Sequence, residues 1–262
     1  MSDVKSIAAL NRLSTNERLE YIKLLIPPTL FERFAFQPDD LTDTQGRTLY
    51  KWAGAESSDV EISLYHDAGA KDPIAFFHLT DTVSGQIHVL LSIFNDPLSP
   101  RFDVDRMPDG TPTMFGTSHR NIEAEKAAFQ AGLAPGQIRR GLRVLGEAII
   151  AFESFVTRLG HDMYFVEPLY YHNAVIFERY GFAYQQGRRW MQSLNTRFSS
   201  ESDLIPKLDG STIFRKREAA NSIRGRSWAI HDNILGEPYT GVTMYKRVNQ
   251  QAGVNTFTGN GW

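Results

Sequence analysis

The chain has 262 residues, of which 42% are hydrophobic and 22% charged, and this composition is typical of a globular protein with one large domain or two small ones. A formal net charge of −2 gives no overall field that would favour nucleic acid or an anionic membrane. The sequence contains no cysteine, which excludes disulfides, thiolate metal ligands and a cysteine nucleophile. It shows no signal peptide and no apolar run long enough for a membrane span, so we expect a cytoplasmic protein.

The first part of the chain is predicted to be helical. Ser14 or Thr15 is a suitable N-cap for the second of two short helices within residues 3–26, with Glu17 in its first turn. Apolar residues then repeat at helical spacing: Leu19, Ile22, Leu25 and Ile26. We expect residues 1–57 to form an N-terminal helical segment that packs on the main domain.

Three strands are predicted next, at residues 60–65, 74–79 and 87–94. The links between them are short and contain glycine, which favours antiparallel hairpins. The third strand, IHVLLSIF, is almost continuously apolar and is therefore expected at the centre of the sheet. These strand segments also carry His66, His78 and His88, which could suggest a metal trio. Their side-chain parity favours core or edge histidines instead, and we predict no metal site.

A long excursion and two helices follow. Residues 96–120 are rich in proline and glycine and are predicted to form a long loop, a kind of loop that is often functional. Asn121 is a suitable cap for a helix at 122–131. A longer helix is predicted from apolar residues at alternating spacings of four and three: Ile138, Leu142, Leu145, Ile149, Phe152, Val156 and Leu159.

The start of this longer helix is basic. Arg139, Arg140 and Arg143 follow Gly136, and cations at a helix N-terminus oppose the helix dipole and repel one another. The pattern therefore indicates an anion-binding turn. The alternative is a solvated helix face, because the apolar stripe lies elsewhere.

The remaining elements are predicted as a strand at 163–166, a helix at 173–180, a strand at 182–190, a loop at 195–211, a helix at 213–220 and a last strand at 242–248. Strands that alternate with helices are typical of a parallel strand pair covered by a helix. The polar tail at 249–262 is expected to be loose. The basic stretch 215–226 lacks the aromatic interleaving of a nucleic-acid site, so a solvated helix is the simpler interpretation and nucleic acid is not an expected partner.

This order of elements, with RRGLRVLGEAI at 139–149 and HNAVIFERYGF at 172–182, resembles the GNAT superfamily of acyl-CoA-dependent N-acetyltransferases. The resemblance covers residues 58–190 and the last strand. It implies an α/β fold of the α+β type, with a mixed central sheet, antiparallel N-terminal strands, a splayed parallel pair and flanking helices. The transferase domain would span 58–248, with insertions at 96–135 and 191–240.

The resemblance further implies transfer of an acetyl or other short acyl group from acyl-CoA directly to the amine of a small molecule or peptide, in a protein that can form a homodimer. The CoA pyrophosphate and pantetheine would be held by the following residues: Gly136, Gln137, Arg139, Arg140, Gly141, Arg143, Asn173 and Phe177. The segment 215–226 could reach the 3′-phosphate of CoA.

The candidates for proton transfer are Glu167, His172 and Tyr180. Each has a structural alternative: an exposed strand end for Glu167, a helix cap for His172, and core packing for Tyr180. The chain departs from the family pattern because Arg143 and Leu145 occupy positions of small residues, Phe177 replaces a tyrosine, and the strand 87–94 lacks a glutamate. A non-catalytic GNAT-fold module for ligand binding or protein interaction is therefore the alternative function.

Overall fold

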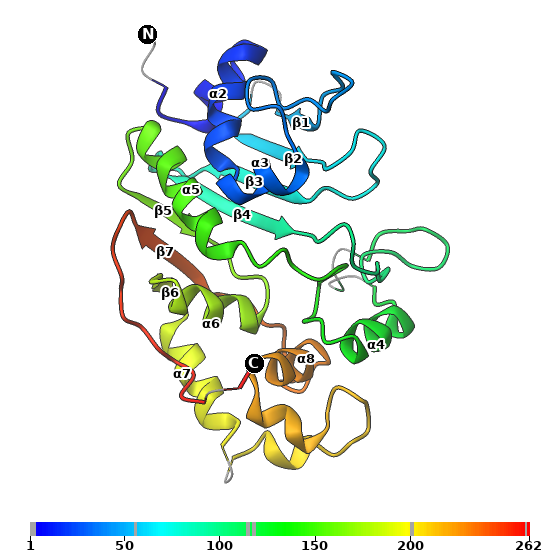
Figure 1. Cartoon of the computed structure of the whole chain (residues 1–262). Helices are drawn as coiled ribbons and strands as arrows, with labels where there is room; N and C mark the ends of the chain where they lie inside the picture. Colours follow the sequence, from blue (N-terminus) through cyan, green and yellow to red (C-terminus); the bar gives the residue numbers. More distant parts are fainter. Residues whose placement is uncertain (1–3, 55–56, 114–115, 117–118, 200–201, 260) are drawn as a thin grey trace. The chain divides into compact units, whose positions relative to one another are not determined.

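The computed structural model describes residues 4–54, 57–113, 116, 119–199, 202–259 and 261–262. Within these residues the protein is a mixed α/β fold with a seven-stranded sheet and flanking helices (Figure 1). The strands are hydrogen-bonded in the order β1-β2-β3-β4-β5-β7-β6. The predicted α/β class is thus confirmed, and so is the central place of the strand at 87–94, which is β4.

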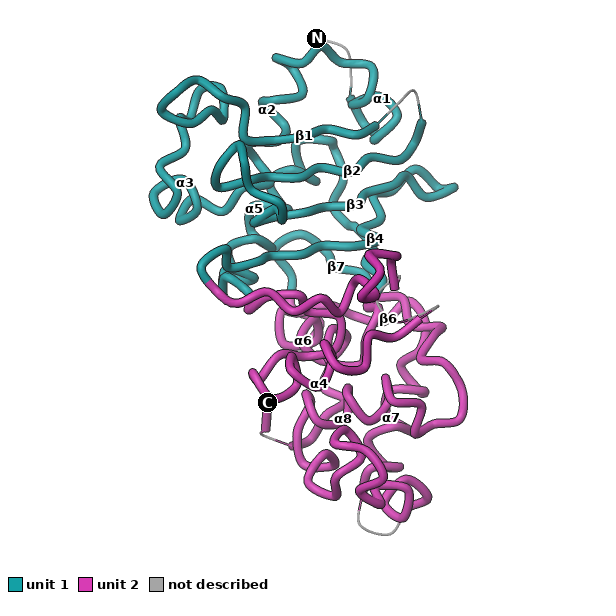
Figure 2. The backbone as a smooth tube through the Cα atoms, turned by 90° about the vertical axis from the view of Figure 1, so that its right-hand side faces the viewer, with its two compact units in different colours: residues 1–98, 141–167, 245–250 teal, residues 99–140, 168–244, 251–262 magenta. Residues whose placement is uncertain are grey.

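The chain divides into two compact units, which Figure 2 colours separately. Unit 1 consists of residues 1–98, 141–167 and 245–250, and unit 2 of residues 99–140, 168–244 and 251–262. Unit 1 contains α1 (Ile7–Asn11), α2 (Thr15–Leu25), α3 (Pro28–Phe34), β1 (Tyr50–Ala53), β2 (Asp59–Leu64), β3 (Ala75–Asp81), β4 (Ile87–Phe94), α5 (Leu145–Arg158), β5 (Met163–Val166) and most of β7 (Thr243–Arg247).

The strands β1 to β4 of unit 1 form an antiparallel meander, as the short links predicted. Apolar side chains on one face of these strands are buried, for example Ile62 on β2, Leu79 on β3 and Val89 on β4. On that side α1 packs against β2 and β3, and Phe152 of α5 contacts the Phe77 ring. The other face carries polar and half-exposed side chains. This alternation is the physical basis of the period-two pattern in the sequence.

The pairing of β4 with β5 is parallel and short. It joins Ile87, His88 and Val89 to Tyr164, Phe165 and Val166. The last hydrogen bond runs from the Glu167 N–H to the Val89 carbonyl, at 3.2 Å. The register of β4 with β3 also shifts at this point, so that Leu90 is the extra residue of a β-bulge. The second half of β4, from Leu90 to Phe94, therefore continues beyond its pairing with β5.

A buried ion pair ties β7 to α5 within unit 1. Lys246 Nζ lies 3.2 Å from Glu153 Oε1, with side-chain exposures of only 3% and 9%, so water screens the pair poorly. The second oxygen of Glu153 accepts a hydrogen bond from the Asn249 N–H at 2.9 Å. Lys246 also donates to the Gln250 carbonyl. Both charges are thus compensated, as burial requires.

Unit 2 is mainly helical. It contains α4 (Ile122–Gln130), α6 (Tyr171–Arg179), β6 (Ala183–Gln186), α7 (Arg188–Arg197), η2 (Ile205–Lys207), η3 (Arg217–Asn221) and α8 (Ile223–His231). The helix α6 packs against α8, and α8 against η3. The Asn121 side chain caps α4 by accepting from the Ala124 N–H, as predicted.

The long helix predicted from Ile138 was wrong at its start, because α5 begins at Leu145. Arg143 has a φ of 62°, in the left-handed region, which breaks a right-handed helix. Ile138 packs instead in a cluster of unit 2 with Val104, Ala128 and Leu133. Ile138 therefore continues the apolar spacing of α5 along the sequence, although it is not part of that helix.

Other boundaries also differ from the prediction. The N-terminal segment includes a strand, β1, and the strand predicted to reach Trp190 ends at Gln186, because Gly187, with φ 93°, starts α7. The helix α7 extends into the predicted loop at 195–211. The helix predicted at 213–220 is replaced by a turn and η3, and α6 begins at Tyr171 rather than after His172.

The helix α8 was missed because nearly all its side chains are buried, so that no one-sided stripe marks it. The tail is not loose throughout, since Thr256 and Phe257 are buried. The buried Glu178 carboxylate accepts hydrogen bonds from the Thr256 N–H and hydroxyl, at 2.9 Å and 2.7 Å. These bonds hold the tail to α6 within unit 2.

Replacing Lys246 with methionine should leave Glu153 buried without its cation. We expect the free energy of unfolding to fall by about 3–5 kcal/mol, the usual cost of breaking a buried pair on one side. Urea denaturation followed by circular dichroism measures this. Arg247→Met on the same strand is the matched control, because its pair with Asp162 is exposed and should contribute about 0–1 kcal/mol. Equal effects of the two variants would contradict the assignment.

Candidate functional site

The predicted phosphate-binding turn is divided between the two units. Its first four residues belong to unit 2 and its last two to unit 1: Gly136, Gln137, Arg139 and Arg140, then Gly141 and Arg143. We describe each group within its own unit.

The unit 2 residues of the turn are engaged in local structure. Gly136 has a φ of 80°, and a Cβ there would lie 2.7 Å from the Tyr170 hydroxyl oxygen, so the position requires glycine. The Gln137 side chain accepts from the Ala134 N–H at 2.7 Å. The Arg139 guanidinium donates to the Ser99 carbonyl, and Arg140 donates to the Ala131 carbonyl at 3.4 Å. These contacts hold the loop.

The unit 1 residues of the turn, in contrast, lie beside β4 or point into solvent. Gly141 lies beside the end of β4, since a Cβ on it would be 3.6 Å from the Phe94 carbonyl oxygen. Arg143 is exposed, and within the described part of the chain its guanidinium makes no hydrogen bond or ion pair. Its left-handed backbone costs about 1–2 kcal/mol relative to glycine. A non-glycine residue in such a conformation is a reason to examine the position for function.

The helix α5 begins directly after this turn with an open first turn. Val144 occupies the N-cap position and has no side-chain acceptor for the first backbone N–H groups. Gly146, the second helical residue, has no side chain that would cover them. The Glu147 carboxylate accepts a hydrogen bond from the Thr29 hydroxyl at 2.7 Å. Backbone donors and the positive end of the helix dipole thus lie next to Arg143, an arrangement suited to an anion.

His172 neither caps α6 nor lies at an exposed edge. Tyr170 occupies the N-cap position, and His172 is only 4% exposed, with Nδ1 2.8 Å from the Ser227 hydroxyl oxygen of α8. Burial, assisted by the nearby His231, lowers the pKa of His172 from 6.5 to about 3. The imidazole is therefore neutral at pH 7.

The other predicted residues of α6 do not converge on His172. Asn173 lies in the first turn, Phe177 packs against Phe182 with ring centroids 4.9 Å apart, and Tyr180 follows the last helical residue. Phe177 is thus a packing residue in unit 2. His172 and Tyr180 lie at opposite ends of the helix, so they do not form a joint proton-transfer site.

Glu167 lies in unit 1, directly after β5. Its side chain is exposed, while its N–H makes the last hydrogen bond to β4. His88 is on β4 opposite Phe165, and its Nε2 is buried without a hydrogen-bond partner in the described structure. His66 lies beyond the end of β2, in contrast to the prediction that all three histidines are on strands.

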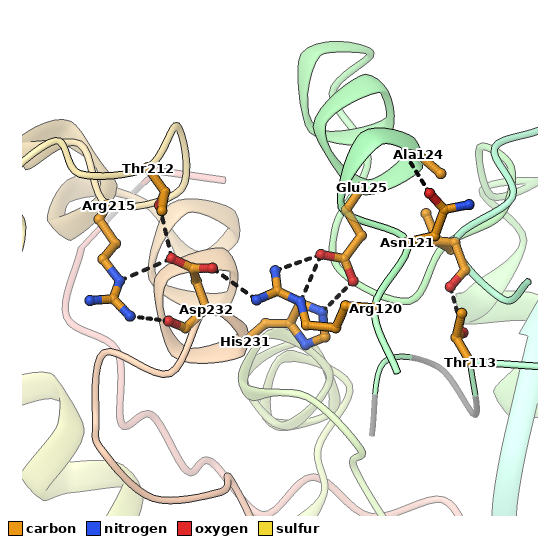
Figure 3. A network of polar contacts seen from close by, with 10 residues as sticks. Thr113, Arg120, Asn121, Ala124, Glu125, Thr212, Arg215, His231 and Asp232 are labelled. Atoms are coloured by element: carbon orange, nitrogen blue, oxygen red, sulfur yellow. Dashed lines mark hydrogen bonds and ion pairs between the residues drawn. The ribbon is translucent and has the colours of Figure 1, made fainter. Parts of the chain in front are cut away.

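A polar network in unit 2 was not found from the sequence. Figure 3 shows the Arg120 guanidinium between two carboxylates, those of Glu125 on α4 and Asp232 at the end of α8. Arg120 Nη2 lies 2.5 Å from Glu125 Oε2, and Nη1 lies 2.9 Å from Asp232 Oδ1. His231 Nε2 donates to the other oxygen of Glu125 at 2.9 Å.

The network continues on the far side of Asp232. Arg215 Nε and the Thr212 hydroxyl donate to Asp232 Oδ2, at 2.9 Å and 2.8 Å (Figure 3). Two arginines thus balance two buried carboxylates, and His231 donates a hydrogen bond to one of them. Full hydrogen bonding and charge balance indicate a network that holds α4, α8 and the segment at 212–215 together in unit 2.

The sequence does contain a weak signal for this network. Glu125 lies three residues before the buried Ala128, so the two side chains share the buried face of α4. An acidic residue on a buried face requires a partner. Arg120 lies five positions before Glu125, but His231 follows 106 positions after it, and a single sequence does not reveal such a distant pairing.

The described residues contain no group of three or more His, Cys, Asp or Glu side chains placed to hold a metal ion. Within the same residues, no helix is both long and apolar enough to cross a membrane. No protein-family model, curated protein sequence or solved structure matches the chain.

Replacing Glu125 with glutamine tests the unit 2 network. Burial alone would raise the pKa of Glu125. Hydrogen bonds and positive charge from His231 and Arg120 outweigh this effect, so that the pKa lies below its usual value of 4.5. The carboxylate thus stabilises the fold fully above pH 4.5, and its contribution is lost as the pH falls through the lowered pKa. We expect the variant to lose about 3 kcal/mol of unfolding free energy at pH 7, with a difference that shrinks in acid.

Urea denaturation at several pH values measures this difference. Glu123→Gln is the matched control on the same helix, because the Glu123 side chain is 83% exposed and its pair with Lys126 should contribute within about 0.5 kcal/mol. A pH-independent loss in Glu125→Gln would show that lost packing, rather than lost charge, explains the effect.

The burial of His172 gives a second pH prediction. Between pH 6.5 and about 3 the unfolded chain binds a proton at this position that the folded protein does not, so stability falls with decreasing pH in this window. We expect the imidazole to remain neutral at pH 5 in a nitrogen-detected NMR titration, with the signal assigned through His172→Asn. An imidazolium spectrum at pH 5 in the folded protein would contradict the buried, Ser227-bonded geometry.

Proposed function

We propose that the protein is an acyl-CoA-dependent N-acyltransferase whose donor site lies in unit 1. One juxtaposition carries the proposal: an uncapped helix N-terminus preceded by Arg143 lies beside the end of β4, at the half of this central strand that extends beyond its pairing with β5. The resemblance of the motif residues contributes less, because several of those residues have structural roles in unit 2.

The phosphates of CoA suit the start of α5. The first backbone N–H groups of the helix and the exposed Arg143 guanidinium supply donors and positive charge without competition from a capping side chain. Position 143 has the left-handed backbone that glycine would adopt most easily. In this proposal the arginine replaces a close backbone approach by a direct side-chain contact to the pyrophosphate.

The pantetheine arm suits the second half of β4. Its two amide groups resemble a peptide, and an extended peptide can add to the free edge of a strand through backbone hydrogen bonds. The stretch Leu90–Phe94 would offer about 13 Å of strand at 3.3 Å per residue. Its side chains are half-buried on both faces, in contrast to the alternation in the first half of β4.

The chemistry requires no enzyme nucleophile. An amine positioned next to the thioester can attack it directly, while backbone N–H groups at the strand edge stabilise the developing oxyanion. The acceptor is therefore an amine of a small molecule or peptide, and the donor acetyl-CoA or another short acyl-CoA. A chain without cysteine can carry out this reaction.

A non-catalytic module with the same ligand is the second candidate. The residues at 172 and 177 favour it, because Phe177 has no ionisable group and the buried His172 is hydrogen-bonded to Ser227. The two candidates differ in thiol release from acetyl-CoA, which only the transferase produces across a panel of amines.

Isothermal titration with acetyl-CoA tests the donor site. We expect micromolar affinity that weakens with added salt, and Arg143→Ala should weaken it about tenfold or more, since a hydrogen bond to a charged group contributes about 1.5–3 kcal/mol. Alanine has the same backbone strain as arginine at this position, so the variant isolates the side chain.

Arg158→Ala, at the other end of the same helix, is the matched control and should leave affinity unchanged. Pantetheine, which lacks the pyrophosphate, should bind much more weakly than CoA. Equal affinities of Arg143→Ala and wild type would show that the phosphates are placed wrongly. Absence of acetyl-CoA binding to the folded wild-type protein would refute both the transferase and the CoA-binding module.

A further inference from the structure

Two buried side-chain nitrogens of unit 1, His66 Nδ1 and His88 Nε2, have no hydrogen-bond partner within the described residues. His88 Nε2 is buried and accepts or donates no hydrogen bond within the described residues, although a buried polar atom without a partner is costly. The ring lies edge-on to Phe165 on β5, with centroids 6.3 Å apart. Packing thus holds the imidazole in place and leaves this nitrogen without a partner in the described structure.

The position of His88 is defined by strand register. His88 is opposite Phe165 in the parallel pair, and Glu167 lies two residues beyond Phe165, so all three side chains are on the same face of the sheet. This face is opposite to the one on which Phe152 of α5 packs against Tyr164. Both His88 and Glu167 are within one residue of the last β4–β5 hydrogen bond.

The charged and titratable groups of unit 1 on this face can be named for each neighbouring strand. They are Asp59 and Glu61 on β2, His78 on β3, which lies 2.8 Å from Asp59, Glu167 after β5, and Tyr245 and Arg247 on β7, where the Tyr245 ring is near Phe165. Thr80, directly opposite His88 on β3, is uncharged. Glu167 is the group whose charge acts on His88.

We propose that His88 is the proton acceptor of the acyl transfer and that Glu167 is the positioning residue that stabilises its charged form. This inference rests on the proposed function, in which pantetheine extends from Phe94 towards Leu90. The thioester would then arrive at the point where the two strands stop pairing. His88 and Glu167 are the titratable side chains that the register places there.

The step balances without a further reactant. The amine nitrogen attacks the thioester carbonyl carbon, the C–N bond forms, and the C–S bond breaks with its electron pair on sulfur. The proton that the nitrogen loses passes to His88 Nε2, and the imidazolium then returns it to the CoA thiolate. The Glu167 carboxylate stabilises the intervening imidazolium.

The protonation state of His88 agrees with this role. Burial lowers the pKa of His88 below 6.5, and the negative charge of Glu167 partly offsets that shift. The ring is therefore neutral at pH 7 and able to accept a proton. Loss of the Glu167 charge should lower this pKa further.

Thiol release with acetyl-CoA and a responsive amine, measured from pH 5 to 9, tests the inference. His88→Asn should bind acetyl-CoA as wild type does but lose about 100-fold or more in kcat/KM. Glu167→Gln should move the acid limb of the pH profile to lower pH, and an NMR titration of His88 should show the same shift. His78→Asn, on the same face, is the matched control and should retain full activity.

The outcomes separate this inference from the proposed function. If the wild type binds acetyl-CoA and releases thiol while His88→Asn remains equally active, or while Glu167→Gln leaves both pH curves unchanged, the proton-transfer pair is wrong and the transferase stands. If the wild type binds acetyl-CoA and releases no thiol with any amine, the inference fails together with catalysis. If it does not bind acetyl-CoA, the proposed function itself fails.

Discussion

The short parallel pairing of β4 with β5 is the constraint on which the proposed donor site depends. Three residue pairs hold these strands together, and a bulge at Leu90 bends β4 where the pairing ends. The second half of the strand then has backbone groups beyond β5, beside the turn that starts α5. The same register places His88 and Glu167 on one face at this point, so one backbone feature positions both the proposed binding edge and the proposed proton acceptor.

The two units contain buried charges that differ in function. In unit 2 the Glu125 and Asp232 carboxylates are each met by an arginine, and His231 completes the hydrogen bonding of Glu125. A network with every member paired rigidifies a fold and leaves little capacity for proton transfer. In unit 1, by contrast, His88 Nε2 is buried and unpartnered, and Arg143 is exposed and unpaired in the described structure. The proposed site is therefore distinguished by polar groups without a protein partner, and not by the number of its charges.

Several residues that the sequence predicted as site residues have structural roles instead, because contacts with distant segments determine what they do. Gly136 is required by the close approach of Tyr170, and His172 is buried against Ser227. Arg139 and Arg140 donate to loop carbonyls. Residue type and spacing alone do not distinguish a guanidinium that binds a ligand from one that satisfies a carbonyl. Arg143 stays a candidate because its left-handed backbone and its exposure are properties of the folded turn.

The sequence by itself determined the α/β class, the antiparallel meander, the central place of β4, the cap at Asn121 and a cap at Ser14 or Thr15, of which the structure has Ser14. These features depend on local periodicity and on side chains near their own backbone. Only the tertiary structure decided where α5 begins, that α8 exists, that the tail packs through Glu178, and which polar atoms lack partners. Each of these depends on burial by residues far away in the chain. A buried helix has no polar face by which the sequence could indicate it. The left-handed backbone conformation of Arg143 is likewise not indicated by the residues next to it.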